Sequence, residues 1–181
     1  MIRSRALTKA AARVSFLTPL QRHFVSARRV GFVGLGRMGL PMARNLARTT
    51  DVIVYDPSPV ACDEALASGM KVVESAQAVG ASDCEVLFAM LPGCQAFDSV
   101  MEEWKDCVRE SQTIVNCSTV SPSTSKKWEA AYRAKGHTVF DSPVSGGVTG
   151  AGDGTLTFMV GCESEDELAK VKPFLDLMNH S

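Results

Sequence analysis

The sequence contains no long run of apolar residues. In its 181 residues, no apolar stretch approaches the length of about 20 residues that a membrane-spanning helix needs. Hydrophobic residues make up 45% and charged residues 22%, an ordinary composition for a globular chain without repeats or low-complexity segments. Length and composition therefore favour a single domain with a proper core, and we expect no membrane partner.

Acidic residues are absent from the start of the chain, because Asp51 is the first of them. Residues 1–27 are instead rich in arginine and serine, and apolar residues recur at helical spacing from Leu7 onward. This pattern is typical of a mitochondrial transit peptide, whereas a secretory signal would carry a continuous apolar core. We therefore expect residues 1–27 to be a transit peptide, cleaved between Arg22 and Arg29, and the protein to lie in the mitochondrial matrix. A disordered basic tail is the alternative.

The net charge of -1 hides an uneven distribution. Five of the 19 basic residues lie in residues 1–27, so the rest of the chain has 14 basic residues against 20 acidic ones. An acidic body gives no support for nucleic-acid binding, and we expect no nucleic-acid partner.

Metal sites and disulfide frameworks also lack a sequence signature. The six cysteines are scattered, with no C-x-x-C pair and no paired histidine: Cys62, Cys84, Cys94, Cys107, Cys117 and Cys162. This spacing does not fit zinc ligation, and a disulfide framework does not fit a reducing compartment. We therefore expect no bound metal, and we expect most of these cysteines to be buried as small hydrophobic residues.

The most informative stretch that is present is glycine-rich. Residues 30–33 predict a buried strand, and Gly34, Gly36 and Gly39 then give G-x-G-x-x-G before a run with helical apolar spacing. In a dinucleotide-binding loop, the first glycine permits a tight turn, the second lets the backbone approach a pyrophosphate, and the third lets the helix pack on the strand. The helix N-terminus offers N–H groups to the phosphates. The predicted cofactor-binding residues of this loop are Gly34, Leu35, Gly36, Arg37, Met38 and Gly39.

An acidic residue stands where this fingerprint requires one. Residues 51–56 predict a second strand, and Asp56 ends it about 20 residues after the glycines. A carboxylate there accepts hydrogen bonds from ribose hydroxyls and repels a 2′-phosphate, and no arginine follows directly. We therefore predict NAD rather than NADP as the cofactor, with Asp56 on the ribose. A turn or helix-cap role before Pro57 is the alternative.

Beyond Asp56, predicted helices and strands alternate. We expect helices at 59–66, 75–79, 97–108, 122–134 and 164–178, and strands at 70–73, 84–91, 113–116, 138–140 and 156–160. A stretch of small residues, 141–154, separates the last two strands. This alternation predicts an α/β fold with a doubly wound, mostly parallel sheet of the Rossmann type over residues 28–181.

Four segments follow the predicted ends of strands: Asp56, Leu91-Pro92, Ser118-Thr119 and Ser145-Gly146-Gly147. In open parallel sheets, ligands bind at the edge formed by the carboxyl ends of the strands. We therefore expect these segments to converge on one crevice.

Several motifs together resemble those of the 3-hydroxyisobutyrate dehydrogenases. The match begins with Phe-Val-Gly-Leu-Gly-Arg-Met-Gly-Leu-Pro-Met-Ala-Arg-Asn-Leu at 32–46, and continues at 90–92, at 118–122, with Asp-Ser-Pro-Val-Ser-Gly-Gly at 141–147, and at 150–161. The related 6-phosphogluconate dehydrogenases share the glycine loop. The resemblance covers about residue 29 to the end. It implies NAD-dependent oxidation of 3-hydroxyisobutyrate to methylmalonate semialdehyde, in mitochondrial valine breakdown.

The same resemblance implies roles for individual residues. It assigns cofactor contacts to Leu91, Pro92 and Thr119, and binding of the carboxylate of a small β-hydroxy acid to Ser145, Gly146 and Gly147. A hydroxyl and backbone N–H groups suit an anion, although an ordinary flexible turn is the alternative for Ser-Gly-Gly. One family position departs, because an asparagine expected shortly after Pro92 is Ala96 here. That change loosens the expected cofactor fit.

The family's catalytic lysine has no counterpart in the sequence. The resemblance places it in a Gly-x-Gly-x-x-x-Lys-x-x-Asn block beyond Ser181, with a last strand after His180 and a helical domain that forms much of the homo-oligomer. Alcohol oxidation needs a group near the hydroxyl to take its proton as hydride leaves. His137 precedes its predicted strand, at the edge of the sheet away from the crevice, and the lysines of the later helices are expected to be solvated. We therefore expect no catalytic residue in this sequence.

Two functional hypotheses follow. The first is a dehydrogenase of the hydroxyisobutyrate type whose catalytic half lies outside this sequence. The second is a non-catalytic dinucleotide-binding remnant or regulatory module, for which the homo-oligomer of full-length relatives is doubtful. Both share the predicted NAD site, and they differ in whether substrate is turned over.

Overall fold

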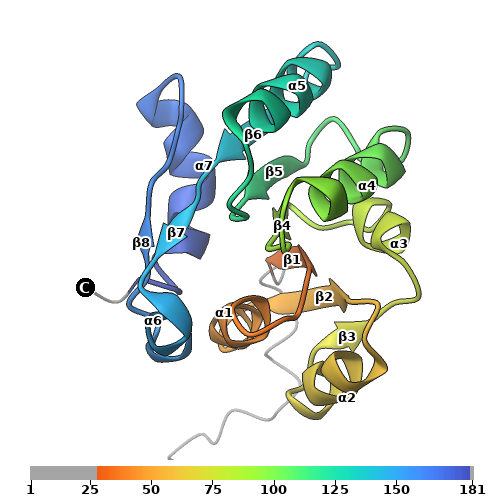
Figure 1. Ribbon diagram of the computed structural model, residues 1–181, viewed down its shortest axis with the longest axis vertical. Helices are drawn as coiled ribbons and strands as arrows, with labels where there is room; N and C mark the ends of the chain where they lie inside the picture. The colour runs from red at the N-terminus through yellow and green to blue at the C-terminus, as the bar shows by residue number, and fades with distance from the viewer. Residues whose placement is uncertain (1–27, 180–181) are drawn as a thin grey trace, which may run out of the picture.

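The computed structural model describes residues 28–179, which form a parallel sheet with helices on both faces (Figure 1). The predicted transit peptide at residues 1–27, and His180, lie outside the described residues. Within residues 28–179, no helix combines the length and the apolar character that crossing a membrane requires.

Six parallel strands make the main sheet, in the order β3-β2-β1-β4-β5-β6. Their bounds are β1 (Arg29–Val33), β2 (Asp51–Tyr55), β3 (Lys71–Val72), β4 (Val86–Ala89), β5 (Thr113–Asn116) and β6 (Thr138–Asp141). The predicted doubly wound α/β fold is confirmed. Because the strand order reverses between β1 and β4, the carboxyl ends of these two strands flank the position where sheets of this type bind ligands.

Helices follow the strands along the chain. They are α1 (Gly39–Leu46), α2 (Pro59–Ala67), α3 (Ala76–Gly80), α4 (Cys94–Trp104), α5 (Pro122–Arg133), α6 (Gly147–Asp153) and α7 (Glu165–Leu175). Four of them begin after a serine whose hydroxyl accepts a hydrogen bond from a backbone N–H of the first turn: Ser58, Ser75, Ser121 and Ser164. The predicted starts of these four helices lie within one residue of the observed ones, whereas α4 begins at Cys94 rather than at residue 97. In contrast, α4 and α7 end earlier than predicted, at Trp104 and Leu175.

The core has two parts, one on each face of the sheet. On one face, Phe32 and Phe88 stack with ring centroids 5.9 Å apart and pack with residues of α1, α6 and α7. On the other face, Leu87 and Ile114 pack with residues of α3, α4 and α5, among them the fully buried Trp104. Strands β1, β4 and β5 contribute to both parts. Burial on both faces explains why β4, Val-Leu-Phe-Ala, is apolar throughout.

The stretch of small residues at 141–154 contains regular structure. It includes the short strand β7 (Val144–Ser145) and helix α6, and β7 pairs antiparallel with β8 (Thr157–Phe158) in a separate two-stranded sheet. The strand expected at 156–160 is therefore shorter and lies outside the parallel sheet. Glycine-rich α6 has little intrinsic helix preference, and its packing on α1 supports it, with Asn45 Nδ2 donating to the carbonyl of Ala151 over 2.8 Å.

The expectation that most of the cysteines are buried is wrong. Cys84 and Cys117 are buried, while three cysteines are half-buried and Cys162 is exposed. The two buried ones stand next to central strands, whereas the half-buried ones belong to helices or their ends, where one side of the chain meets water: Cys62, Cys94 and Cys107. Among residues 28–179, no cluster of histidine, cysteine and acidic side chains could hold a metal ion.

A relay of hydrogen bonds links the carboxyl ends of β4, β5 and β6. Asn116 Nδ2 donates to Asp141 Oδ1 over 2.9 Å, and Asn116 Oδ1 accepts from the N–H of Ser118 over 2.9 Å. The Ser118 hydroxyl then accepts from the N–H of Leu91 over 2.9 Å and donates to the carbonyl of Ala89 over 3.3 Å. Because Asn116 and Ser118 are buried, this relay fixes the direction in which the chain leaves β4 at Leu91.

Ser142 is a second buried serine at this edge, but its hydroxyl has no hydrogen-bond partner among the described residues. Only its backbone is held, since its N–H donates to the carbonyl of Asn116 over 2.8 Å. A buried hydroxyl without a partner has lost its hydrogen bonds to water and formed none within the protein, so it lowers the free energy of unfolding. Ser118 and Ser142 are therefore comparable in burial, but the Ser118 hydroxyl is hydrogen-bonded and the Ser142 hydroxyl is not.

Replacing Ser142 by alanine should raise the free energy of unfolding by about 1 kcal/mol, because it removes an unpaired buried hydroxyl. Replacing Ser118 by alanine should lower it by about 1–3 kcal/mol, because it leaves the Leu91 N–H without its acceptor. Urea unfolding followed by circular dichroism measures both. Equal losses of stability in the two variants would show that the Ser142 hydroxyl is satisfied after all.

Candidate functional site

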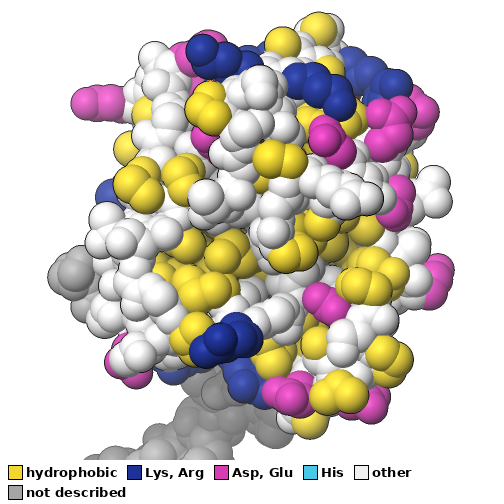
Figure 2. Space-filling model, in the orientation of Figure 1, with side chains coloured by type: hydrophobic (Ala, Val, Ile, Leu, Met, Phe, Trp, Pro, Cys, Tyr) yellow, Lys and Arg dark blue, Asp and Glu magenta, His cyan; other side chains and the backbone are white. Residues whose placement is uncertain are grey.

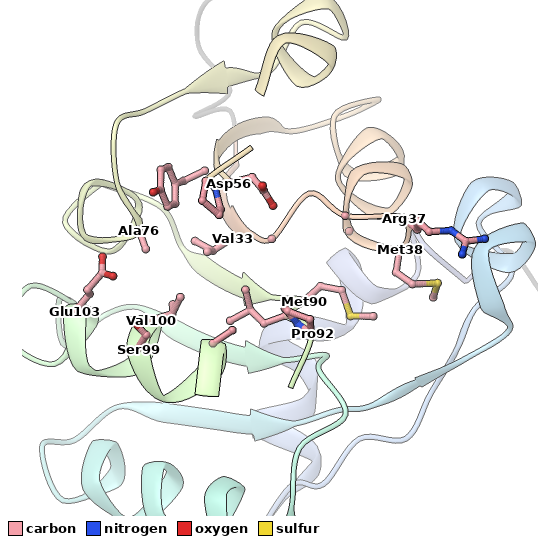
Figure 3. Close-up of a pocket in the computed structure, with 17 residues that line it drawn as sticks. Val33, Arg37, Met38, Asp56, Ala76, Met90, Pro92, Ser99, Val100 and Glu103 are labelled. Carbon is pink, nitrogen blue, oxygen red and sulfur yellow. The ribbon is translucent and has the colours of Figure 1, made fainter. Parts of the chain in front are cut away.

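A cleft of about 650 Å³ opens at the carboxyl ends of β1, β2 and β4 (Figure 3). Its walls come from the glycine loop, the ends of β2 and β4, and the helices α3 and α4. Figure 2 shows apolar side chains gathered in the middle of one face of the molecule, with charged side chains toward its margins. The volume falls within the range of about 300–1,000 Å³ that is usual for small-molecule sites.

Gly34 makes the turn from β1 into the glycine loop. Its φ of +95° lies in the region that side-chain-bearing residues avoid, and its N–H donates to the carbonyl of Tyr55 over 3.0 Å. A Cβ at this position would also overlap the carbonyl oxygen of Met90. Position 34 therefore requires glycine for both conformation and space.

Gly39 and Gly36 serve different needs. A Cβ at position 39 would overlap the carbonyl oxygen of Gly34, so glycine there lets α1 begin directly against the turn. A Cβ at position 36 would meet no heavy atom of the described residues within 4 Å. The fold therefore demands glycine at 34 and 39, and leaves position 36 open to the approach of a ligand.

The N-terminus of α1 is free to bind an anion. The residue before the helix, Met38, provides no side-chain cap, and no acidic residue stands in the first turn. Pro41 lies in that turn, where its missing N–H costs little. Arg37, exposed at the cleft, adds a positive charge beside the positive end of the helix dipole. This arrangement suits a phosphate group.

Asp56 ties the end of β2 to the glycine loop. Its Oδ2 accepts from the N–H of Leu35 over 2.7 Å, and its Oδ1 accepts from the N–H of Ser58 over 2.8 Å. The second bond confirms the turn role that the sequence left open. The ribose-binding role remains a prediction. It is compatible with the first role, because a carboxylate has about four lone-pair sites and two backbone donors leave the others free.

Leu91, Pro92 and Ala96 line the cleft on the side of β4 and α4. Ala96 stands where the resemblance expects asparagine, so its methyl group offers no hydrogen bond there. Thr119 is exposed and does not line this cleft, whereas its neighbour Ser118 lies buried behind the wall and holds Leu91. The cofactor contacts assigned to Leu91, Pro92 and Thr119 remain predictions.

Ser145, Gly146 and Gly147 do not line the described cleft. Ser145 pairs with Thr157 in the two-stranded sheet, while Gly146 precedes α6 and Gly147 begins it. All three are exposed. Of the four segments expected to converge on one crevice, Asp56 and Leu91-Pro92 line this cleft and the other two do not. Their substrate-binding role remains a prediction.

Four residues of the cleft belong to no sequence motif: Ala76, Ser99, Val100 and Glu103. On α4, positions 96, 99, 100 and 103 follow helical spacing, so they share a face beside the buried one. That periodicity was the available signal for three of them. Ala76 begins α3, which was predicted at 75–79, but nothing in the sequence places that helix beside the cleft.

The charged side chains that line the cleft are Arg37, Asp56 and Glu103, and no lysine or histidine among the described residues lines it. His137 lies buried just before β6, with its ring 5.6 Å from the ring of Tyr132. Desolvation lowers the pKa of His137, so it is held neutral in the core. The lining therefore offers no group suited to take a proton from an alcohol at neutral pH.

Cys94 begins α4 beside Pro92 and borders the same wall. The N–H of Ser121 donates to its Sγ over 3.2 Å. This bond, with hydrogen bonds from the hydroxyls of Thr124 and Ser121, lowers the pKa of the thiol. The cleft thus has a thiol of raised acidity at its margin.

The family comparison agrees with this geometry. The NAD-binding domain of 6-phosphogluconate dehydrogenase matches residues 29–181. The mitochondrial 3-hydroxyisobutyrate dehydrogenase of Homo sapiens is 38% identical over 180 residues, and the NAD-dependent L-serine dehydrogenase of Pseudomonas aeruginosa is 36% identical over 159 residues. These matches cover 97% and 85% of this chain and 52% of each relative. The chain spans about half the length of the curated relatives it matches.

A solved structure gives the same result. The 3-hydroxyisobutyrate dehydrogenase of Mycobacterium tuberculosis, determined with L-serine, superposes with a TM-score of 0.80 at 34% identity, covering 84% of this chain and 52% of that one. The cleft, the glycine loop and the family match agree on the cofactor class. The chain therefore belongs to the 3-hydroxyisobutyrate dehydrogenase-like family of NAD-binding oxidoreductases, whose cofactor domain it shares with 6-phosphogluconate dehydrogenase.

Proposed function

We propose that residues 28–181 form a domain that holds NAD along the cleft, with the pyrophosphate over the glycine loop and the adenosine ribose on Asp56. The observation that carries this proposal is the hydrogen bond from the Leu35 N–H to Asp56 Oδ2, because it brings the carboxylate and the phosphate-binding loop together. Leu91 and Pro92 form the opposite wall. The contact proposed for Thr119 rests on the family resemblance, because Thr119 does not line the cleft. A bare carboxylate at the ribose favours NAD over NADP, since it would repel a 2′-phosphate.

For the substrate, we propose a small β-hydroxy acid, with 3-hydroxyisobutyrate oxidised to methylmalonate semialdehyde in valine breakdown. The exposed Ser145 hydroxyl and the backbone N–H groups of Gly146 and Gly147 would hold the carboxylate. Relatives of similar identity carry other names, including the 2-hydroxy-3-oxopropionate reductase of Escherichia coli at 40%. Each of these names refers to a small polar substrate. They therefore support a small β-hydroxy acid as the substrate class more than they support 3-hydroxyisobutyrate in particular.

When bound, NAD supplies the hydride acceptor; the protein must supply the group that takes the hydroxyl proton. The cleft lining offers no lysine or histidine among the described residues. We therefore propose that the 181-residue polypeptide binds the cofactor without turning substrate over, and that the acid/base group is the lysine that the family resemblance places beyond Ser181. A non-catalytic binding or regulatory module is the alternative, supported by the same missing group.

For location, we propose the mitochondrial matrix, with residues 1–27 as transit peptide. The support is the acid-free, arginine-rich composition of that segment and the mitochondrial names of the human and Drosophila melanogaster relatives. Because bacterial relatives match as well, the names of the relatives do not decide the location, and the proposal rests mainly on the composition of residues 1–27. A homo-oligomer is proposed only for the full-length protein.

Replacing Gly36 by alanine should leave the melting temperature unchanged, because the added methyl group meets open space. It should weaken NAD binding about tenfold or more, because the methyl group occupies the space that the pyrophosphate needs, at a cost of about 1–3 kcal/mol. Gly39→Ala is the contrasting variant and should prevent stable folding, because its methyl group overlaps the Gly34 carbonyl. Calorimetric titration with NAD and thermal unfolding measure both properties. Unaltered NAD affinity in Gly36→Ala would place the phosphates elsewhere.

The purified 181-residue polypeptide should bind NAD and produce no NADH from 3-hydroxyisobutyrate, because no lining residue takes the hydroxyl proton. NADH fluorescence over time measures turnover, and a full-length 3-hydroxyisobutyrate dehydrogenase is the positive control. Turnover near the rate of the control would show that a base exists within this chain.

A further inference from the structure

One end of the cleft lies beyond Asp56, away from the start of α1. In Figure 3, Ala76, Ser99, Val100 and Glu103 lie at this end, and Arg37 and Met38 lie at the other, with Asp56 between them. If the adenosine ribose sits on Asp56 and the pyrophosphate on the glycine loop, the base attached to that ribose must point toward Ala76 and Glu103. In the proposed mode of NAD binding, this end of the cleft therefore holds the adenine base, and we call it the base pocket.

The walls of the base pocket suit a flat ring with one polar edge. Tyr55, Pro57, Ala76 and Val100 supply mostly apolar surface to the cleft here, and Ser99 adds a hydroxyl. Of the described residues that line this end, Glu103 is the one with a charge. A carboxylate only accepts hydrogen bonds, so it favours a ligand edge that carries N–H donors.

Glu103 is exposed, and one hydrogen bond directs its carboxylate toward α3. Its Oε2 accepts from the backbone N–H of Gln77 in the first turn of α3 over 3.3 Å. Its other oxygen, Oε1, takes part in none of the hydrogen bonds or ion pairs found among the described side chains. The neighbouring Glu102, in contrast, pairs with Lys105 Nζ over 3.0 Å. Each of these adjacent glutamates has one bonded oxygen, but of the two only Glu103 lines the cleft, so its Oε1 is the one that a ligand there can reach.

We propose that Glu103 selects adenine by accepting a hydrogen bond from its exocyclic amino group. The proposal rests on the proposed binding of NAD. Adenine presents two N–H donors at this position, whereas hypoxanthine presents a carbonyl oxygen that a carboxylate repels. A charge-assisted hydrogen bond is stronger than a neutral one, so a single carboxylate suffices to discriminate between the bases. Glu103 is therefore a specificity-determining residue that acts far from the reacting carbon.

The test compares NAD with nicotinamide hypoxanthine dinucleotide by calorimetric titration of the 181-residue chain. The wild type should bind NAD about tenfold more tightly, the difference expected from one hydrogen bond to a charged group. Glu103→Gln should reduce this ratio to about one or below, because an amide can donate to the carbonyl oxygen. Glu102→Gln removes the same charge from the adjacent position and should keep the tenfold ratio.

The outcomes distinguish a failure of NAD binding from a failure of adenine selection by Glu103. If the wild type binds neither dinucleotide, the proposed function fails and the inference falls with it. If the wild type binds both equally, or if Glu103→Gln keeps the tenfold ratio, NAD binding stands and the selection of adenine by Glu103 is overturned. A purely structural role through Gln77 would lower the melting temperature and both affinities without changing their ratio. Equal binding of both dinucleotides by the wild type overturns the inference even if Glu103→Gln fails to fold.

Discussion

The hydrogen bond between the Leu35 N–H and Asp56 Oδ2, 2.7 Å long, is the constraint on which the site depends. It joins the loop after β1 to the residue after β2, two neighbouring strands whose register is set by the sheet. Asp56 also holds its own turn through Ser58, so the carboxylate is fixed from two sides. One side chain thus orders the loop, the turn and the floor of the cleft together.

The opposite wall depends on a relay of polar side chains, of which Asn116 and Ser118 are buried. Asp141, Asn116 and Ser118 pass hydrogen bonds from β6 through β5 to the Leu91 N–H. Each member is useful only because the previous one orients it, which is characteristic of buried polar networks. The position of Leu91 at the cleft is therefore set by residues that do not themselves line it.

Much of the fold could be predicted from the sequence, because its main signals are local. Apolar runs marked β2 and β4, and Ser58 followed by Pro59 marked the start of α2. The glycine loop and Asp56 could be identified because they follow strands directly. In contrast, α6 and the antiparallel pairing of β7 with β8 depend on tertiary packing that small residues do not reveal. Helical spacing placed Glu103 on one face of α4 with Ala96 and Ser99, but that face becomes a wall of the cleft only when α3 packs beside it.

A side chain at position 36 and one at position 39 are restricted for separate reasons, and this difference bears on how such a domain can diverge. Position 39 is closed by the Gly34 carbonyl, whatever the chain binds. Position 36 is open in the protein alone, so only a ligand restricts it. A descendant that gave up its cofactor could accept a side chain at 36 and keep its fold, but not at 39. The fold therefore accounts for the glycine at 39, whereas the glycine at 36 is accounted for only by the approach of a ligand.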